Sequence, residues 1–129
     1  MTVEDLKKYF KNKSDYEYDP CTECYWENIN RWIDVECYIY LNKENKRCVI
    51  SFNDTTAEIV EEWEIKELNH DHIFEIKYVT VPKNKIYINL KNTNYNQFKK
   101  LMDSSISKLS LSFKKEQVQN KLYKMSQDF

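Results

Sequence analysis

The sequence contains no glycine in its 129 residues, although about 7% glycine, or roughly nine residues, is usual for a chain of this length. Glycine adopts positive φ freely and lets a backbone approach a phosphate closely. Its absence excludes the glycine-rich phosphate loops of nucleotide-binding proteins and kinases, and the nucleophile elbow of α/β-hydrolases. Turns must therefore be built on other residues, and the 13 asparagines are the best substitutes because asparagine tolerates the left-handed backbone.

Composition indicates a single domain with a real core. Hydrophobic residues make up 41% of the chain and aromatic residues 15%. No apolar run approaches the roughly 18 residues that a membrane span needs, and the first residues lack the features of a signal peptide. We therefore expect one cytoplasmic domain over residues 1–129, with no membrane partner and with its four cysteines as thiols.

The charge is distributed unevenly along the chain. Residues 1–80 hold 10 Lys and Arg against 18 Asp and Glu, a net charge of −8, whereas residues 81–129 hold 10 Lys against three acids, a net charge of +7. Two halves of this kind either serve different partners or neutralise each other when they pack together. The abundance of lysine, asparagine and isoleucine is also typical of AT-rich coding sequence, which suits a bacterial or phage protein.

Two helices are predicted near the N-terminus. Thr2 and Asp5 are spaced as a capping box, and the apolar residues that follow predict a helix over residues 3–12. Asp19-Pro20 is a second helix-start signal. Apolar residues then recur at helical spacing, which predicts a second helix over residues 20–32.

The hydrophobic period changes to two beyond residue 32. This alternation predicts five strands, over residues 33–41, 48–52, 56–67, 73–81 and 85–91. Pro82-Lys83-Asn84 is expected to close a hairpin between the last two strands. Because short turns join consecutive strands, the expected sheet is an antiparallel meander.

The C-terminal third is predicted to be mainly helical. One helix is expected near residues 94–103, and Val118, Leu122 and Met125 predict the apolar face of a last amphipathic helix. Residues 104–113 fit both strand and helix spacing; we favour helix, with a break near residues 103–105. The expected fold class is α+β, with a five-stranded antiparallel meander flanked by two N-terminal and one or two C-terminal helices.

Cys21 and Cys24 form the sharpest chemical motif. Thiols in the first turn of a helix have a lowered pKa, which suits redox chemistry or zinc binding. A thioredoxin-like motif, however, follows a strand, whereas a polar linker precedes this pair. We expect buried cysteines and no cofactor, with zinc or redox chemistry as the alternative.

Further zinc ligands would have to come from elsewhere in the chain. The expected strand pairing sets Cys37 opposite Ser51 and points Cys37 and Cys48 to opposite sides of the sheet, so both cannot reach one zinc ion. One of these two cysteines could still join Cys21 and Cys24, and so could His70 or His72, which lie in a predicted loop.

The lysine-rich C-terminal third suggests nucleic-acid binding as another alternative. Lys99, Lys100, Lys114 and Lys115 could neutralise phosphates. Arginine, the commonest reader of bases, is absent after Arg47, so this interpretation is not favoured.

The favoured interpretation is a non-enzymatic binding module, because no nucleophile–base pair can be identified. Glu58, Glu62 and Glu64 share the outward side of one predicted strand, and Tyr38 and Tyr40 are expected beside them. An acidic, aromatic sheet face of this kind would bind another protein, or a second copy of the chain. An inhibitor, an immunity protein or a phage anti-defence factor would fit that role.

Overall fold

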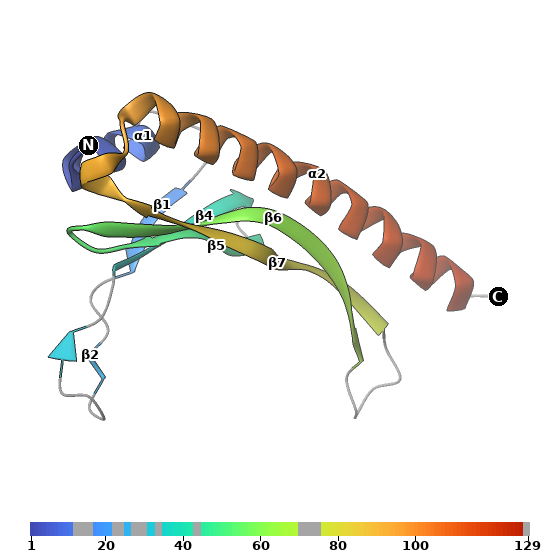
Figure 1. The fold of residues 1–129 in the computed structure, drawn as a ribbon. Coiled ribbons are helices and arrows are strands. Elements are labelled where there is room, and N and C mark those ends of the chain that lie inside the picture. Colours follow the sequence, from blue (N-terminus) through green and yellow to red (C-terminus); the bar gives the residue numbers. More distant parts are fainter. Residues whose placement is uncertain are drawn as a thin grey trace.

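The computed structural model describes the backbone of residues 1–11, 17–21, 25–26, 31–32, 35–42, 45–69 and 76–127, and the side chains of residues 1–10, 47–68 and 76–127. In chain order the elements are α1 (Val3–Lys11), β1 (Glu17–Cys21), β2 (Tyr25–Trp26), β3 (Arg31–Trp32), β4 (Val35–Asn42), β5 (Asn45–Phe52), β6 (Thr56–Asn69), β7 (Ile76–Asn89), a 3₁₀ helix (Leu90–Asn92) and α2 (Tyr95–Gln127). The described residues thus form an α+β fold in which α2 lies along an antiparallel sheet (Figure 1).

The sheet is centred on the long hairpin of β6 and β7. Strands are hydrogen-bonded in the order β1-β4-β5-β6-β7, while β2 pairs with β3 separately. β5 pairs with β6 only at Ile50–Phe52, opposite Ala57–Ile59. Beyond those residues β6 continues with β7 as its partner, so the two long strands depend on α2 to cover them.

The predicted helix over residues 20–32 is wrong. Pro20 and Cys21 end β1, which pairs antiparallel with β4, and the other described residues of this range form β2 and β3. The helix-start signal of Asp19-Pro20 reflects only the local conformational preference of these residues. Pairing with β4 satisfies the backbone N–H and C=O groups of β1 in an extended conformation instead.

The predicted five-stranded meander and the number of helices are not confirmed. The two strands expected over 73–81 and 85–91 are joined in one strand, β7 (Ile76–Asn89), because the chain does not turn at Pro82; residues 73–75 lie outside the described residues, and Leu90 and Lys91 belong to the 3₁₀ helix. The pairing of β6 with β7 shifts by one residue at Glu61 and shifts back at Lys83. Proline is tolerated at such irregularities and on an edge strand, where its missing N–H removes no ladder hydrogen bond.

The C-terminal third is a single helix, α2, without the break predicted near residues 103–105. Its start is capped reciprocally: Asn94 N–H donates to Gln97 Oε1 (3.1 Å), and Gln97 N–H donates to Asn94 Oδ1 (2.9 Å). Five large apolar side chains then face the sheet at helical spacing and are buried, namely Phe98, Met102, Ile106, Leu109 and Phe113. Each contributes about 1.5–3 kcal/mol by burial, which favours one unbroken helix.

The small helix α1 completes one end of the core. Its Leu6, Tyr9 and Phe10 are buried, and the rings of Tyr9 and Phe98 meet edge to face with centroids 5.6 Å apart. The Tyr9 hydroxyl donates to Asp103 of α2. The predicted capping box is present, with Thr2 N–H donating to Asp5 Oδ2 (2.9 Å) and Asp5 N–H donating to Thr2 Oγ1 (3.2 Å).

Side chains of α2 and β5 bind the backbone of Tyr78 and Thr80 at the outer edge of β7. Asn120 accepts from Tyr78 N–H through Oδ1 (2.8 Å) and donates through Nδ2 to Tyr78 O (3.0 Å). One helical turn earlier, Glu116 Oε1 accepts from Thr80 N–H (2.8 Å). Arg47 of β5 donates through Nε to Thr80 O (2.8 Å). We call these four contacts the edge lock.

Within the edge lock, Arg47 and Glu116 also bind each other. The guanidinium Nη2 lies 3.4 Å from Glu116 Oε1, with the side chains 21% and 7% exposed. The same guanidinium lies over the ring of Phe113, 5.3 Å from its centroid. A carboxylate this buried needs such partners, so Glu116 fixes the rotation of α2 about its own axis.

Replacing Glu116 should destabilise the fold strongly. Glu116→Ala removes the acceptor of both Thr80 N–H and Arg47 in a buried place, so we expect the free energy of unfolding to fall by about 3 kcal/mol. Urea unfolding followed by circular dichroism measures this. The control Gln117→Ala, at an exposed neighbour, should stay within about 0.5 kcal/mol of wild type, and an equal effect of both variants would contradict the edge lock.

The capping box of Thr2 and Asp5 should stabilise the fold at neutral pH but not in strong acid. Hydrogen bonds from the backbone N–H of Thr2, and secondly from its hydroxyl, hold the pKa of the Asp5 carboxyl below its usual value. A lowered pKa stabilises the fold above the unfolded-state pKa of about 4, and this contribution disappears as pH falls through the lower folded-state pKa. Unfolding curves of wild type and Asp5→Asn should therefore differ at pH 6 and converge in strong acid; an unchanging difference would contradict this.

Candidate functional site

The predicted acidic residues of β6 are partly neutralised by lysines. Glu58, Glu62 and Glu64 are all half-buried. Glu58 Oε1 lies 3.4 Å from Lys85 Nζ on the neighbouring strand, and Glu64 Oε1 lies 3.6 Å from Lys66 Nζ. Two of the three carboxylates therefore already have a cationic partner, which weakens the field that they could present to another protein.

The two predicted tyrosines lie on a different part of the sheet. Tyr38 and Tyr40 are in β4, opposite Cys48 and Lys46 of β5, and their side chains lie outside the described residues. Those residues of β5 do not pair with β6. Strand pairing therefore does not bring the tyrosines beside Glu62 and Glu64, and a shared aromatic and acidic face stays a prediction.

The zinc alternative falls mainly on parts of the chain that are not described. Cys21 is described only as backbone in β1, and Cys24, His70 and His72 lie outside the described residues. Among the residues whose side chains are described, no group of three or more His, Cys, Asp or Glu could hold a metal ion. Zinc binding therefore stays a prediction.

The predicted register of the other two cysteines is wrong. Cys37 is opposite Ile50, and its neighbour Tyr38 is opposite Cys48, because β5 carries one additional residue, Val49, between them. Cys48 itself donates from Sγ to Ile50 O at 3.4 Å. An alternation of side chains along the strand could not reveal this bulge.

The four lysines of the nucleic-acid alternative are exposed on α2. Lys99 and Lys100 lie near the start of the helix, whereas Lys114 and Lys115 follow 15 residues later, roughly 22 Å along the axis. They therefore form two separate basic groups: the first lies beside Tyr95, which is exposed, and the second lies among exposed aliphatic side chains.

A second apolar face of α2 is exposed. Four large side chains are 49–58% exposed in the C-terminal half of the helix: Leu111, Val118, Leu122 and Met125. We call them the outer stripe. At 100° per residue they share one side of the helix, opposite the buried side chains such as Leu109 and Phe113. Val118, Leu122 and Met125 thus lie on one face of a helix, as predicted, but this face is exposed. Periodicity reveals a stripe but not which stripe meets the sheet.

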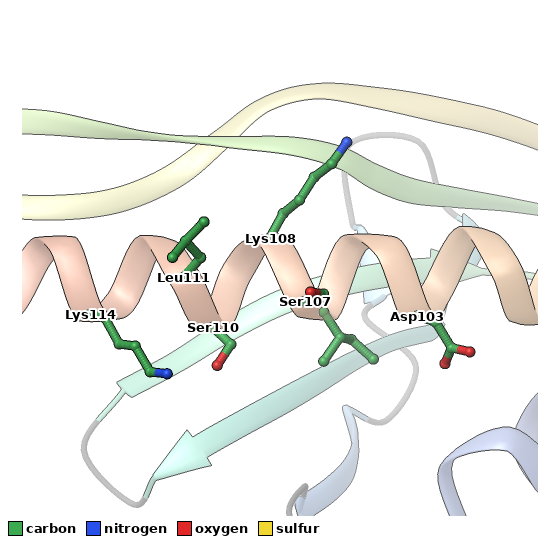
Figure 2. A pocket seen from close by; sticks show the side chains of 7 residues that line it. Asp103, Ser107, Lys108, Ser110, Leu111 and Lys114 are labelled. Atoms are coloured by element: carbon green, nitrogen blue, oxygen red, sulfur yellow. The ribbon is translucent and has the colours of Figure 1, made fainter.

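Lysines border the outer stripe on both sides. Lys114 and Lys121 lie along one side, and Lys108 and Lys115 lie along the other. Figure 2 shows Lys108 and Lys114 extending from opposite sides of α2, with Leu111 between them. The only acid of residues 104–127 is Glu116, which is buried in the edge lock, so the exposed surface here is basic.

Two hollows adjoin this surface. One, of about 480 Å³, runs beside α2 past Ser107 and Ser110 to Lys114 (Figure 2). The other, of about 340 Å³, lies between α2 and β6, and it is lined by Ile65, Lys114, Lys115, Val118 and Gln119. We call the second hollow the Ile65 depression; it extends the apolar surface from Val118 onto the sheet.

No protein-family model matches the chain, and neither the curated proteins nor the solved structures include a significant match. Within the described part of the chain, no helix has the combination of length and hydrophobicity needed to cross a bilayer. Function must therefore be argued from the side chains of this chain alone.

The two apolar faces of α2 should respond oppositely to polar substitution. The double variant Leu111→Gln/Leu122→Gln should leave the free energy of unfolding within about 0.5 kcal/mol of wild type, because both residues are more than half exposed. Leu109→Ala, on the buried side, should lower it by about 3 kcal/mol. Urea unfolding measures both, and a large loss in the double variant would show that the outer stripe is buried.

Proposed function

We propose that the chain is a non-enzymatic binding module that recognises another protein through the outer stripe and its bordering lysines. The single observation that carries the proposal is the apolar and basic outer surface of α2 between Leu111 and Met125. A cytoplasmic inhibitor, immunity protein or phage anti-defence factor would use such a module.

The chemistry of the outer stripe supports a role in recognition. Single exposed apolar residues are ordinary, but several on one face of one helix form the kind of patch that marks an interaction site. The outer stripe is not needed for the core, since the opposite face of α2 already supplies Phe98, Met102 and Leu109. Binding offers a physical reason for four large apolar side chains in these positions.

Two other surfaces support the function less well. The acidic strand has Glu58 and Glu64 already paired with lysines, so it has fewer charges to offer a partner. Nucleic-acid binding would share Lys114 and Lys115 with this surface, but the exposed apolar side chains of the outer stripe are aliphatic, whereas single-stranded nucleic acid is bound by aromatic side chains that stack on bases. A protein partner can use both the lysines and the aliphatic side chains.

Site-specific photo-cross-linking would test this function in the cells that naturally express the chain. A benzoylphenylalanine at position 118, in the centre of the outer stripe, should yield an adduct with one other protein after irradiation. Leu111→Glu should abolish that adduct, because a carboxylate would then occupy the apolar contact.

A matched probe at position 62 serves as the comparison, since Glu62 lies in the predicted acidic surface. An adduct at position 62 without one at position 118 would show that the partner binds the sheet and not the outer stripe. Adducts at neither position would contradict a protein-binding function for both surfaces.

A further inference from the structure

We infer that the segment bound by the outer stripe is an amphipathic α-helix of the partner with acidic residues on both sides of its apolar face. This inference rests on the function proposed above and specifies the partner's chemistry. Three observations support it: the spacing of the apolar side chains, the arrangement of the lysines, and the Ile65 depression.

The spacing is that of a helix–helix seam. Leu111, Val118 and Met125 repeat every seven residues, and Leu122 lies between the last two. The stripe is narrow and spans 15 residues, with about 21 Å of helix between its first and last Cα atoms. A narrow seven-residue repeat suits the packing of one helix against another, whereas a globular core uses a wider apolar face.

The lysines follow the same repeat on both borders. Lys114 and Lys121 are seven residues apart on one side, and Lys108 and Lys115 are seven residues apart on the other. Charges that flank a helix seam select the partner by attraction and exclude helices of like charge. A helix with Glu or Asp beside its apolar residues therefore complements this surface.

The same arrangement disfavours a second copy of the chain. Helix-to-helix association of two outer stripes would bring lysines against lysines, and no exposed carboxylate of residues 104–127 could relieve the repulsion. A membrane surface is disfavoured because helices that lie in the lipid interface use aromatic and leucine residues over a broad face. The outer stripe is narrow and contains no aromatic residue.

The Ile65 depression offers a place for one apolar side chain of the partner. Its volume of about 340 Å³ lies between Ile65 of β6 and Val118 of α2. Lys114 and Lys115 line it and are exposed, and a lysine can cover apolar surface with its aliphatic stem while its ammonium group meets an acidic side chain. The depression would fix the partner helix along the side of α2 that is nearer to β6.

Synthetic helices test the inference directly. The probe is a stapled 21-residue helix with leucines in a seven-residue repeat and glutamates on both borders; its matched control carries lysines in place of the glutamates. Fluorescence anisotropy with the intact chain should show binding of the glutamate peptide at least about tenfold tighter than the lysine peptide, and weaker binding as salt rises.

Two sets of variants assign the binding to the outer stripe. Val118→Glu should abolish binding of the glutamate peptide. The double reversal Lys114→Glu/Lys121→Glu should shift the preference by about tenfold or more toward the lysine peptide. Lys77→Glu, an exposed position on β7 away from the stripe, is the matched control and should change nothing.

Several results would overturn the inference. Equal binding of the two peptides, or no binding of the glutamate peptide, would refute acidic-helix recognition. So would Val118-dependent binding to phosphatidylserine vesicles in place of the peptide, or a dimer in light scattering that Val118→Glu dissociates. A cross-linked partner joined at position 118 through a segment that is not an acidic helix would also refute it while leaving the proposed function intact; loss of every adduct would refute the function itself.

Discussion

The hydrogen bonds between α2 and the outer edge of β7 are the constraint on which the rest of the structure depends. An edge strand presents backbone donors and acceptors that must be satisfied, and the edge lock does this for Tyr78 and Thr80 with side chains from α2 and Arg47. Because Glu116 and Asn120 must face β7, the rotation of α2 is set, and the outer stripe must face away from the sheet. The candidate binding surface is thus a consequence of how the edge is closed.

Local signals in the sequence predicted the elements that local chemistry controls. Thr2 and Asp5 identified the cap of α1, and helical spacing identified most of α2. The helix start predicted at Pro20 and the turn predicted at Pro82 were wrong, since both prolines lie in strands. A proline is compatible with a helix start or a turn, but also with a strand at an edge or a bulge. Which alternative wins depends on the strand that lies opposite, and a single sequence does not show that partner.

The candidate site was harder to predict for the same reason. Val118, Leu122 and Met125 were recognised as one apolar face, but that they face solvent follows from Glu116, a charged residue whose burial no hydrophobic pattern reveals. Glu58 and Glu64 were recognised as outward-facing acids, but their lysine partners depend on strand register and side-chain conformation. Sequence periodicity identified surfaces; tertiary hydrogen bonds and ion pairs decided which surface carries unneutralised charge.

Residue-resolved amide hydrogen exchange by NMR tests the edge lock most directly. If Glu116 and Asn120 hold the outer edge of β7, the amides of Tyr78 and Thr80 should be as strongly protected as those that pair β7 with β6. Exchange of both amides at the rate of an exposed strand edge would show that α2 is not locked to β7. The orientation of the outer stripe, and the binding surface built on it, would then have no structural basis.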